Sequence, residues 1–397
     1  MSSASPSGLT GWASVNAHGQ NGTKGGLGGD TVRVSTLTDL VFQSQRTEPL
    51  TILIEGMIDL STLTVTGRYV FVHSHKSIIG AQPGSGIING GFRIREPHRN
   101  IIFRNLNITN SPEDGIQING EIFHIWINHC TFTGSGDGAV DVSNGANYIT
   151  ISHSLFTGLN RASLVGHSDN DPFRDRLKVT FHHNWFRGTT QRHPRVRFGQ
   201  VHVFNNYYSH LGLYGIGIGD RAQIISEHNF FEGVVTPSRF YDDPDNLGFF
   251  IDTGSILLNS GSFASRPSGI NWRPSDHYAY TLDSALHVRQ IVMANSGAEP
   301  LPTQAPVIHA PVLGIQVSVF PNPMREFANI QIYLPEASRI RLDLLDITGR
   351  KIHTVAEQFE NAGYLRIPLH RGGLQSGVYL LRLEAGNAIK TIRLLIQ

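Results

Sequence analysis

The octapeptide IWINHCTF (125–132) returns in variant form along the middle of the chain. Apolar and polar residues alternate in each copy, the fifth residue is always His or Asn, and most copies end in an aromatic residue. The six copies are IIFRNLNI (101–108), IWINHCTF (125–132), ITISHSLF (149–156), VTFHHNWF (179–186), VHVFNNYY (201–208) and IISEHNFF (224–231). Self-similarity at roughly 20–30 residues, in units that alternate with period two, is typical of a solenoid built from strands.

This repeat predicts a parallel β-helix. The fifth positions are separated by 24, 24, 30, 22 and 23 residues, and no helical pattern of the kind that a βαβ unit needs lies between the copies. Each copy is therefore expected to form a strand of one coil, with equivalent residues of successive coils about 4.8 Å apart. KSIIG (76–80) fits as part of a preceding coil.

Histidine and asparagine at the fifth position are interpreted as structural, because Asn tolerates the backbone of a tight corner and bonds its neighbours along a stack. His129, His153, His183 and His228 all recur at this position. A zinc site needs ligands that converge from different directions, and the spacing predicts none. Cys130 is the only cysteine, so no internal disulfide is possible, and its apolar strand pattern indicates an inert core residue.

The composition excludes several classes of protein. The net charge is +1, so no overall field selects nucleic acid or a membrane surface. No apolar run reaches the roughly 18 residues of a membrane span. The first residues, MSSASPSGLTGWASV, lack a basic segment followed by an apolar core, so no signal peptide is expected in the sequence as written. Nothing indicates an obligate dimer, and a monomer is expected.

Four charged residues fall at one height of the repeat. Asp114 and Arg192 follow their fifth positions by nine residues, and Asp137 and Arg161 follow theirs by eight. In a stack of coils these side chains are expected to form a column on one exterior face, two carboxylates followed by two guanidinium groups. Asp141 is expected beside this column.

The stretch DGAVD (137–141) predicts a calcium site. Fully extended, it would hold its two carboxylates ~13 Å apart, but Gly138 permits a bend that brings them together. With Asp114 as a stacked neighbour, the three carboxylates repel one another unless they are protonated or neutralised. Ca²⁺ accepts several carboxylates together with waters. The alternative is three solvated surface aspartates.

An arginine-rich stretch accompanies the acidic residues. RHPRVRFG (192–199) holds three arginines, and arginine binds carboxylates through two parallel hydrogen bonds. Calcium next to such a cluster would suit an acidic polymer. The alternative is that the arginines pair only with nearby acids, which fits Arg174 and Arg176 better than Arg192 and Arg197.

From about Gly11 to Ala298 the chain resembles the polysaccharide lyases of family 1, the pectate and pectin lyases. Matching stretches include GWASVNAHGQNGTKGGLGG (11–29), NIIFRNLNI (100–108), EDGIQI (113–118), DGAVDVSNGANYITISHSLF (137–156), LVGHSD (164–169), RHPRVRFGQVHVFNNYY (192–208) and WRPSDHYAYTL (272–282). The resemblance implies an all-β chain with a right-handed parallel β-helix. It also implies a calcium-dependent pectate lyase that cleaves α-1,4-polygalacturonate by β-elimination and leaves an unsaturated product.

The resemblance implies roles for six residues. The positions that bind calcium are Asp114, Asp137 and Asp141. Arg192 opens an R-x-P-x-x-R motif and would be the base, although the pKa of arginine ordinarily lies far above neutral. Arg197 closes the motif and helps to hold the substrate or the base. Arg161 stands where the family's pectate lyases usually have Lys, and it is interpreted as substrate-binding.

The chain changes character after the predicted catalytic domain 1–296. GAEPLPTQAPVIHAPVLG (297–314) is a Pro-rich linker, and the alternating strands of 315–397 predict a small antiparallel β-sandwich. VFPNP, LLDITGRKI and GVYLLRLEAG resemble the C-terminal sorting domain of the type IX secretion system. That resemblance implies a secreted or cell-surface protein with the secretion machinery as a partner. A carbohydrate-binding module or a plain stabilising domain is the alternative.

Three other functions compete with the pectate lyase. A pectin lyase would act on methyl-esterified chains without calcium, which the three aspartates and the arginine cluster disfavour. A β-helical glycoside hydrolase would use Asp137 and Asp141 as acid and base with no metal between them, and Arg192 would have no role. A non-catalytic polysaccharide-binding β-helix would need neither Arg192 nor three aspartates. Polygalacturonate or pectin is therefore the expected partner.

Overall fold

A computed structural model describes residues 8–168, 176–298, 315–320, 322–334, 336–361, 363–386 and 388–397. The chain divides into two compact units, Met1–Gln304 and Ala305–Gln397. The predicted linker 297–314 lies almost wholly outside the described residues, as does Arg174. Among the helices of the described ranges, none is long and apolar enough to cross a membrane.

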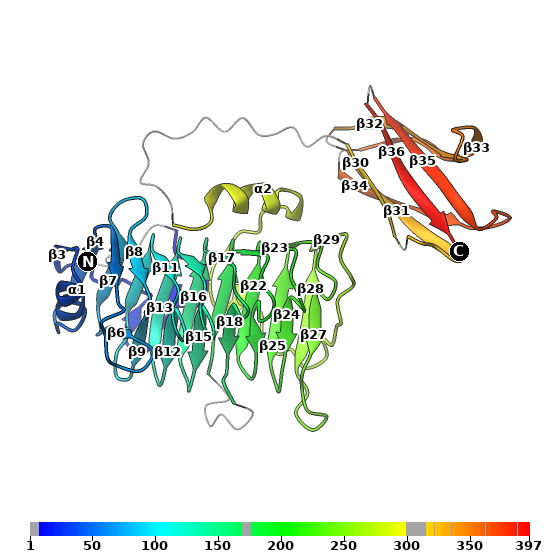
Figure 1. Cartoon of the computed structure of the whole chain (residues 1–397). Helices are drawn as coiled ribbons and strands as arrows, with labels where there is room; N and C mark the ends of the chain where they lie inside the picture. Colours follow the sequence, from blue (N-terminus) through cyan, green and yellow to red (C-terminus); the bar gives the residue numbers. More distant parts are fainter. Residues whose placement is uncertain are drawn as a thin grey trace. The chain divides into compact units, whose positions relative to one another are not determined.

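The first unit is a parallel β-helix of three sheets (Figure 1). Within the described residues, sheet 1 consists of β3 (Asp30–Val34), β4 (Leu50–Ile54), β7 (Lys76–Gly80), β10 (Ile101–Arg104), β13 (Phe123–Asn128), β16 (Asn147–Ser152), β19 (Val179–His182), β22 (Gln200–Phe204), β25 (Gln223–Glu227) and β28 (Phe249–Thr253). Sheet 2 consists of β5 (Met57–Asp59), β8 (Gly86–Ile88), β11 (Asn107–Thr109), β14 (Thr131–Thr133), β17 (Leu155–Thr157), β20 (Trp185–Arg187), β23 (Tyr207–Ser209), β26 (Phe230–Glu232) and β29 (Ile256–Leu258). Sheet 3 consists of β6 (Tyr69–Phe71), β9 (Gly91–Arg95), β12 (Ile116–Asn119), β15 (Val140–Ser143), β18 (Ser163–Val165), β21 (Arg195–Val196), β24 (Ile216–Ile218) and β27 (Ser238–Phe240).

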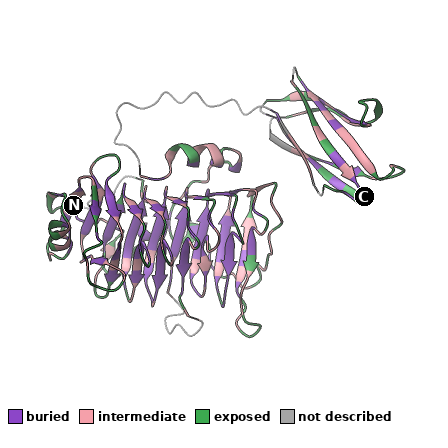
Figure 2. Ribbon diagram, in the orientation of Figure 1, coloured by how far each residue is buried: buried purple, intermediate pink, exposed green. Residues whose placement is uncertain are grey.

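The repeat read from the sequence is the register of sheet 1. The first residues of the six copies pair in series: Ile101, Ile125, Ile149, Val179, Val201 and Ile224. KSIIG forms β7 and pairs with β10, so it belongs to the preceding coil. The predicted fold class is confirmed. The inward-facing apolar residues of all three sheets form one continuous buried core along the helix axis (Figure 2).

The fifth residue of each copy forms the corner between sheet 1 and sheet 2. Its φ is positive in all six copies, from 48° at His153 to 57° at Asn105, the left-handed region that Asn and His enter more readily than most residues. The rings of His129, His153 and His183 stack with centroids 4.8 Å apart. The structural interpretation of these residues therefore agrees with their geometry.

The residue after the corner builds a second ladder that the sequence pattern did not predict. The Oδ1 atom of Asn206 accepts a hydrogen bond from the backbone N–H of Asn184 at 3.0 Å, and Oδ1 of Asn229 accepts one from Asn206 at 2.8 Å. All three side chains are buried. The aromatic residues that end most copies also stack in the core: Phe132, Phe156, Phe186, Tyr208 and Phe231.

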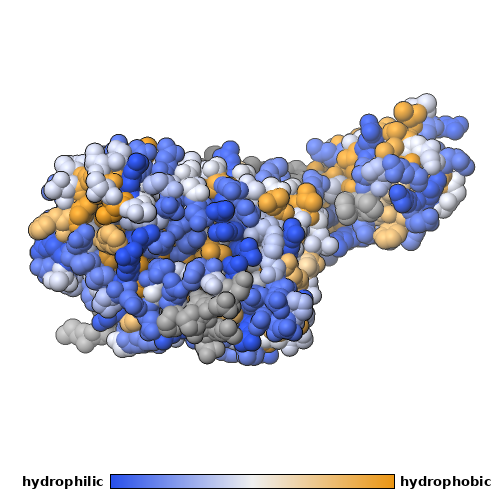
Figure 3. Space-filling view, turned by 60° about the horizontal axis from the view of Figure 1, so that its bottom comes forward, coloured by the Kyte–Doolittle hydropathy of each residue, from blue (hydrophilic) through white to orange (hydrophobic). Residues whose placement is uncertain are grey.

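Short elements cover the outside of this β-helix. Helix α1 (Leu37–Ser44) begins after the N-cap Thr36 and buries Leu40 against the core. Helix α2 (Ala285–Asn295) packs Val288 and Val292 against aromatic residues of β23 and β26. The remaining short elements are β1 (Asn16–Ala17), β2 (Gln20–Asn21), η1 (Trp12–Ser14) and η2 (Pro274–Asp276). The face of the first unit turned forward in Figure 3 is predominantly hydrophilic.

The second unit consists of two antiparallel sheets around a core of its own. Within the described residues, one sheet contains β30 (Gln316–Phe320), β31 (Phe327–Leu334) and β34 (Gly363–His370). The other contains β33 (Lys351–Glu360), β32 (Ser338–Leu345), β35 (Gly377–Ala385) and β36 (Ala388–Ile396). Alternate residues of β32, such as Ile340 and Leu342, face this core, as the predicted sandwich requires.

Candidate functional site

The acidic residues singled out in the sequence lie along the outer face of sheet 3. Asp114 precedes β12, Asp137 precedes β15, and Asp141 lies on β15 in register with Gln117. A hollow on this face is lined by Asp114, Gln117, Asn119, Asp137, Asp141, Ser143, Leu164, His167 and Arg192. The three aspartates and Arg192 therefore share one site.

The expected column of charges is staggered: Asp114 and Arg161 share the height of Gly138, whereas Asp137 lies one residue before that height. Arg161 forms a parallel bridge with Gln191, so Arg192 lies one residue further along its coil. The Nη1 atom of Arg161 lies 2.5 Å from Oδ1 of Asp137, and Nη1 of Arg192 lies 3.6 Å from the same oxygen. Asp137 thus joins the acidic and the basic halves of the site.

Gly138 lies directly against two carboxylates. Its backbone N–H donates to Oδ1 of Asp114 at 2.9 Å, and Gln117 donates to Oδ2 of the same residue at 2.8 Å. A Cβ atom on Gly138 would lie 2.2 Å from Oδ1 of Asp141 and 3.2 Å from Oδ1 of Asp114. The φ of Gly138 is not in the left-handed region. Gly138 is therefore needed because no side chain fits beside the Asp141 carboxylate. The sequence had instead suggested that a glycine is needed here to let the backbone bend.

Burial sets the electrostatics of Asp114 and Asp141, which are 4% and 8% exposed. Burial, followed by the neighbouring Asp114 carboxylate, raises the pKa of Asp141 well above its ordinary value, and the Arg192 guanidinium opposes this shift. Burial also raises the pKa of Asp114, against the hydrogen bonds from Gln117 and Gly138. Both groups would be stabilised as carboxylates by a cation in the hollow.

Arg192 is held in a constrained position. Its φ is 66°, a left-handed conformation that is unfavourable for a residue with a side chain. Its side chain is only 17% exposed. Its buried Nε atom has no hydrogen-bond partner within the described part of the chain. A buried N–H without a partner is uncommon in a folded protein and often marks a functional site.

Arg197 lies at the other end of β21 from Arg192. Its Nη1 atom contacts the carbonyl oxygen of Gly166 at 3.3 Å, and it is not among the residues that line the hollow. The hollow and the Arg161–Asp137 ion pair therefore connect five of the six predicted residues, and Arg197 is not among the described residues that line the hollow.

Sequence reasoning missed Gln117 and Arg195. Gln117 is found when EDGIQI and DGAVD are aligned with a one-residue gap, because Gln117 then falls opposite Asp141 as in the observed register. Arg195 is in register with Leu164 on sheet 3, and its guanidinium lies 4.6 Å from the Tyr241 ring centroid. Burial, and then the charge of Arg197, lower the pKa of Arg195. No local signal in the sequence indicates the contact with Tyr241.

Three histidines also approach one another, at the corner of sheets 1 and 2. Among the described residues, only His153, His182 and His183 place three possible metal-ligand atoms within 4.8 Å of one another. The rings of His153 and His183 stack within 10° of parallel, so their in-plane lone pairs do not converge well on one ion. The Nδ1 atoms of His182 and His183 are 2.9 Å apart, and Asp283 contacts Nε2 of His183 at 2.8 Å. Ring stacking and these two contacts therefore connect the three histidines to one another and to Asp283.

Among the described residues the three aspartates do not form so close a group as these histidines, and Asp137 is paired with Arg161. Their donor set is nevertheless the one that Ca²⁺ prefers, carboxylate oxygens with room for water in an open hollow. The raised pKa values of Asp114 and Asp141 also fit a site built around a positive ion.

Comparison with known proteins gives two family matches. Residues 2–301 match the pectate lyase family, and residues 318–397 match the secretion system C-terminal sorting domain. A pectate trisaccharide-lyase of Bacillus licheniformis is 32% identical over 304 residues, which cover 73% of this chain and 86% of the relative. A probable pectate lyase B of Aspergillus terreus is 34% identical over 259 residues, which cover 62% of this chain and 77% of the relative.

Solved structures agree with these matches. A pectate lyase from Bacillus sp. N165 in complex with trigalacturonate superimposes with a TM-score of 0.64 at 28% identity, covering 73% of this chain and 98% of that one. A Bacillus subtilis pectate lyase mutant superimposes with a TM-score of 0.62 at 26% identity, covering 72% of this chain and 96% of that one.

Proposed function

The chain belongs to the pectate lyase family and is a polysaccharide lyase, and we propose that it cleaves α-1,4-polygalacturonate by calcium-dependent β-elimination in the hollow on sheet 3. One observation carries the proposal: three aspartates and Arg192 line the same hollow, with Arg161 paired to one of the aspartates. The sorting domain indicates that the enzyme is secreted or carried on the cell surface, where pectin would be accessible. The secretion machinery is its expected second partner.

Asp114, Asp137 and Asp141 would hold the calcium ion. Bound calcium would neutralise the substrate carboxylate and stabilise the negative charge that develops beside it. Asp137 now accepts from Arg161 at 2.5 Å, so binding of calcium would weaken this ion pair. Arg161 would then be available to hold a substrate carboxylate, which is the role that the sequence predicts for it.

The reaction needs a group that removes the proton from C5 of galacturonate. That proton is acidic because C5 is bonded to the carboxylate carbon. When the base takes the proton, the C5–H electron pair forms the C4–C5 double bond and the C4–O bond breaks. The leaving glycosidic oxygen then gains a proton from water. No oxidant or external nucleophile is required, so positioning and charge stabilisation are what the protein must supply.

Arg192 is the proposed base. It lines the hollow beside Asp137, its side chain is mostly buried, and its Nε atom has no partner within the described residues. Its backbone is in the left-handed region, with a φ of 66°. Strained backbone of this kind concentrates at functional sites. Arg197, at the far end of β21, would bind the polymer next to the site of cleavage.

The proposal is tested by following the product. The full-length protein is incubated with polygalacturonate, with calcium or with a chelator, while ultraviolet absorbance of the conjugated product and reducing ends are both measured. Elimination predicts that absorbance and reducing ends rise together, and only with calcium. Reducing ends without absorbance would indicate hydrolysis. Absorbance that is insensitive to chelator and stronger on methyl-esterified pectin would indicate a pectin lyase.

A further inference from the structure

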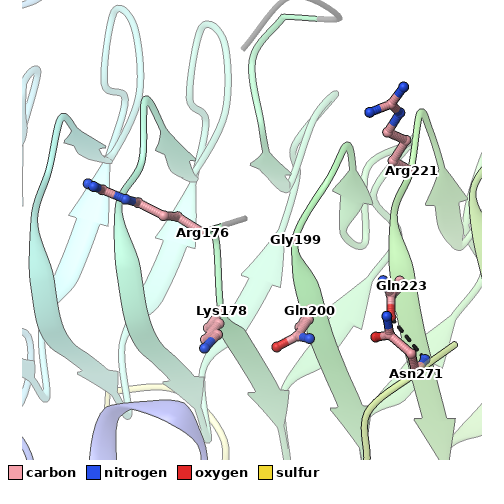
Figure 4. A pocket seen from close by; sticks show the side chains of 7 residues that line it. All are labelled: Arg176, Lys178, Gly199, Gln200, Arg221, Gln223 and Asn271. Carbon is pink, nitrogen blue, oxygen red and sulfur yellow. Dashed lines mark hydrogen bonds between the residues drawn. The ribbon is translucent and has the colours of Figure 1, made fainter. Parts of the chain in front are cut away.

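A second hollow lies at the corner where the chain passes from sheet 3 into sheet 1 (Figure 4). The side chains that line it are Arg176, Lys178, Gln200, Arg221, Gln223 and Asn271. None of them lines the hollow that contains the aspartates. No acidic residue is among the described residues that line this second hollow. It is therefore a separate surface with a basic and amide character.

Three of these side chains form a regular row. Gln200 pairs with Gln223 in sheet 1, and Lys178 directly precedes Val179, which pairs with Val201. Lys178, Gln200 and Gln223 thus occupy the same height in three successive coils, spaced about 4.8 Å apart. Figure 4 shows Lys178 and Gln200 projecting to the same side of their strands. The row presents N–H donors in series along the axis of the β-helix.

The three cations of this hollow differ in how far other residues engage them. Arg176 extends away toward Glu121 and pairs with it at 2.7 Å. The ammonium of Lys178 lies 5.1 Å from the ring centroid of Trp12 and 5.4 Å from that of Tyr148. Arg221 is exposed, and its Nε atom donates a hydrogen bond to Oδ1 of Asn246 at 2.9 Å.

Within the described residues, neither Lys178 nor Arg221 has a carboxylate partner. The amides beside them are positioned for a ligand as well. Oε1 of Gln223 accepts from the backbone N–H of Asn271 at 3.2 Å, which orients that amide and leaves its NH₂ group as a donor. Two cations and two primary amides, with no acidic residue among the described residues that line the hollow, form a receptor for an anionic, hydroxyl-rich molecule.

We propose that this corner hollow is a second binding site for polygalacturonate, which holds carboxylates of the polymer away from the site of cleavage. Lys178 and Arg221 would bind the carboxylates, and Gln200 and Gln223 would bind carboxylate or hydroxyl oxygens. The identity of the polymer rests on the proposed function. Engagement of one chain at two sites raises the effective concentration of the polymer at the second site. Long chains would therefore bind more tightly than short ones.

Retention of the full-length protein by polygalacturonate in a native gel tests this site. The gel contains a chelator, so that calcium cannot contribute. The variant Lys178→Gln/Arg221→Gln is compared with Arg187→Gln/Arg289→Gln, which removes the same charge from sheet 2 and helix α2. We expect the first variant to bind the polymer at least fivefold more weakly than wild type and the second to bind within twofold. Turnover of trigalacturonate is expected to be unchanged in both.

Several results would overturn the site. The first is that polygalacturonate retains Lys178→Gln/Arg221→Gln as strongly as wild type. The second is that the charge-matched control loses as much binding as this variant. The third is that fully methyl-esterified pectin retains the wild-type protein as strongly as polygalacturonate does. Because Lys178 packs beside Trp12, melting temperatures are compared, and the exposed single variant Arg221→Gln decides the matter if the double variant unfolds. Retention without any unsaturated product would refute the proposed function and leave this site standing. Normal formation of unsaturated product, without retention in the gel, would refute this second site and leave the proposed function standing.

Discussion

Single residues of the sheet 3 hollow each contact more than one group of the site. Gly138 donates its N–H to Asp114, and there is no space for a Cβ atom beside the Asp141 carboxylate. Asp137 contacts both Arg161 and Arg192. The sequence could predict that these residues are neighbours, because the repeat fixes their height. It could not predict the Asp137–Arg161 ion pair, which depends on side-chain rotamers and burial.

Gly138→Ala should weaken calcium binding at least tenfold, because the new methyl group would displace the Asp141 carboxylate that lies 2.2 Å from its position. The free energy of unfolding should fall by about 1–3 kcal/mol, as for other overpacked sites. Calorimetric titration with calcium measures the affinity. Gly373→Ala, at a glycine with open space around it, is the control. Calcium affinity within twofold of wild type would show that Gly138 does not shape the site.

His129 provides a test of pH dependence. Burial, and then the charge of Arg104, lower the pKa of His129 to about 4, from 6.5 in the unfolded chain. Between these values the unfolded state gains a proton that the folded state does not. Stability is therefore complete above pH ~6.5 and declines as the pH falls toward ~4. This one group accounts for a loss of roughly 2–3 kcal/mol by pH ~4.5.

His129→Asn should remove this contribution, and Asn already occupies the equivalent corner at Asn105 and Asn205 with similar φ. The free energy of unfolding is measured with urea at neutral pH and near pH ~4.5. Its fall between the two pH values should be smaller in His129→Asn than in wild type by roughly 2–3 kcal/mol. Parallel pH profiles for the two proteins would contradict the role assigned to burial of this imidazole.

At the scale of the elements, the strands of sheet 1 could be predicted closely and the strands of sheet 3 could not. The sheet 1 segments alternate strictly and end in a marked corner, so Ile101, Ile125 and Ile149 align from sequence alone. The sheet 3 strands are short, and β21 contains only Arg195 and Val196. Their register follows from the coils on either side, which is why Gln117 and Arg195 escaped prediction.

The buried ladder next to the corner is expected to be a major source of stability. Asn206 accepts from Asn184 and donates to the carbonyl oxygen of Phe181 at 2.9 Å. Asn206→Ala would remove the acceptor of the Asn184 N–H and a donor to the Phe181 carbonyl oxygen, at about 1–3 kcal/mol for each buried group left without a partner. We expect a loss of roughly 2–5 kcal/mol in urea unfolding. Asn206→Ser should lose less, because Ser154 occupies the equivalent position two coils earlier, where its Oγ accepts from the Cys130 N–H and its N–H donates to Asn184. A loss below about 1 kcal/mol for the alanine variant would show that water replaces these bonds.

At the scale of the whole molecule, the two units have separate hydrophobic cores, so they should unfold independently. A chain that ends at Gln304 is expected to keep lyase activity within twofold and to lose one of two calorimetric transitions. Its export to the cell surface should fail, because the sorting domain is missing. Loss of activity in the truncated chain, with its β-helix still folded, would mean that the second unit takes part in catalysis.

The central claim is that Arg192 acts as the base in a calcium-dependent elimination on sheet 3. The most direct measurement is the rate of unsaturated product formation at saturating calcium and polygalacturonate, for wild type, Arg192→Ala and Arg187→Ala. We predict that kcat falls at least a thousandfold in Arg192→Ala, while calcium affinity and melting temperature stay close to wild type, and that Arg187→Ala is unaffected. A kcat for Arg192→Ala within tenfold of wild type would contradict the claim and assign proton removal to another group.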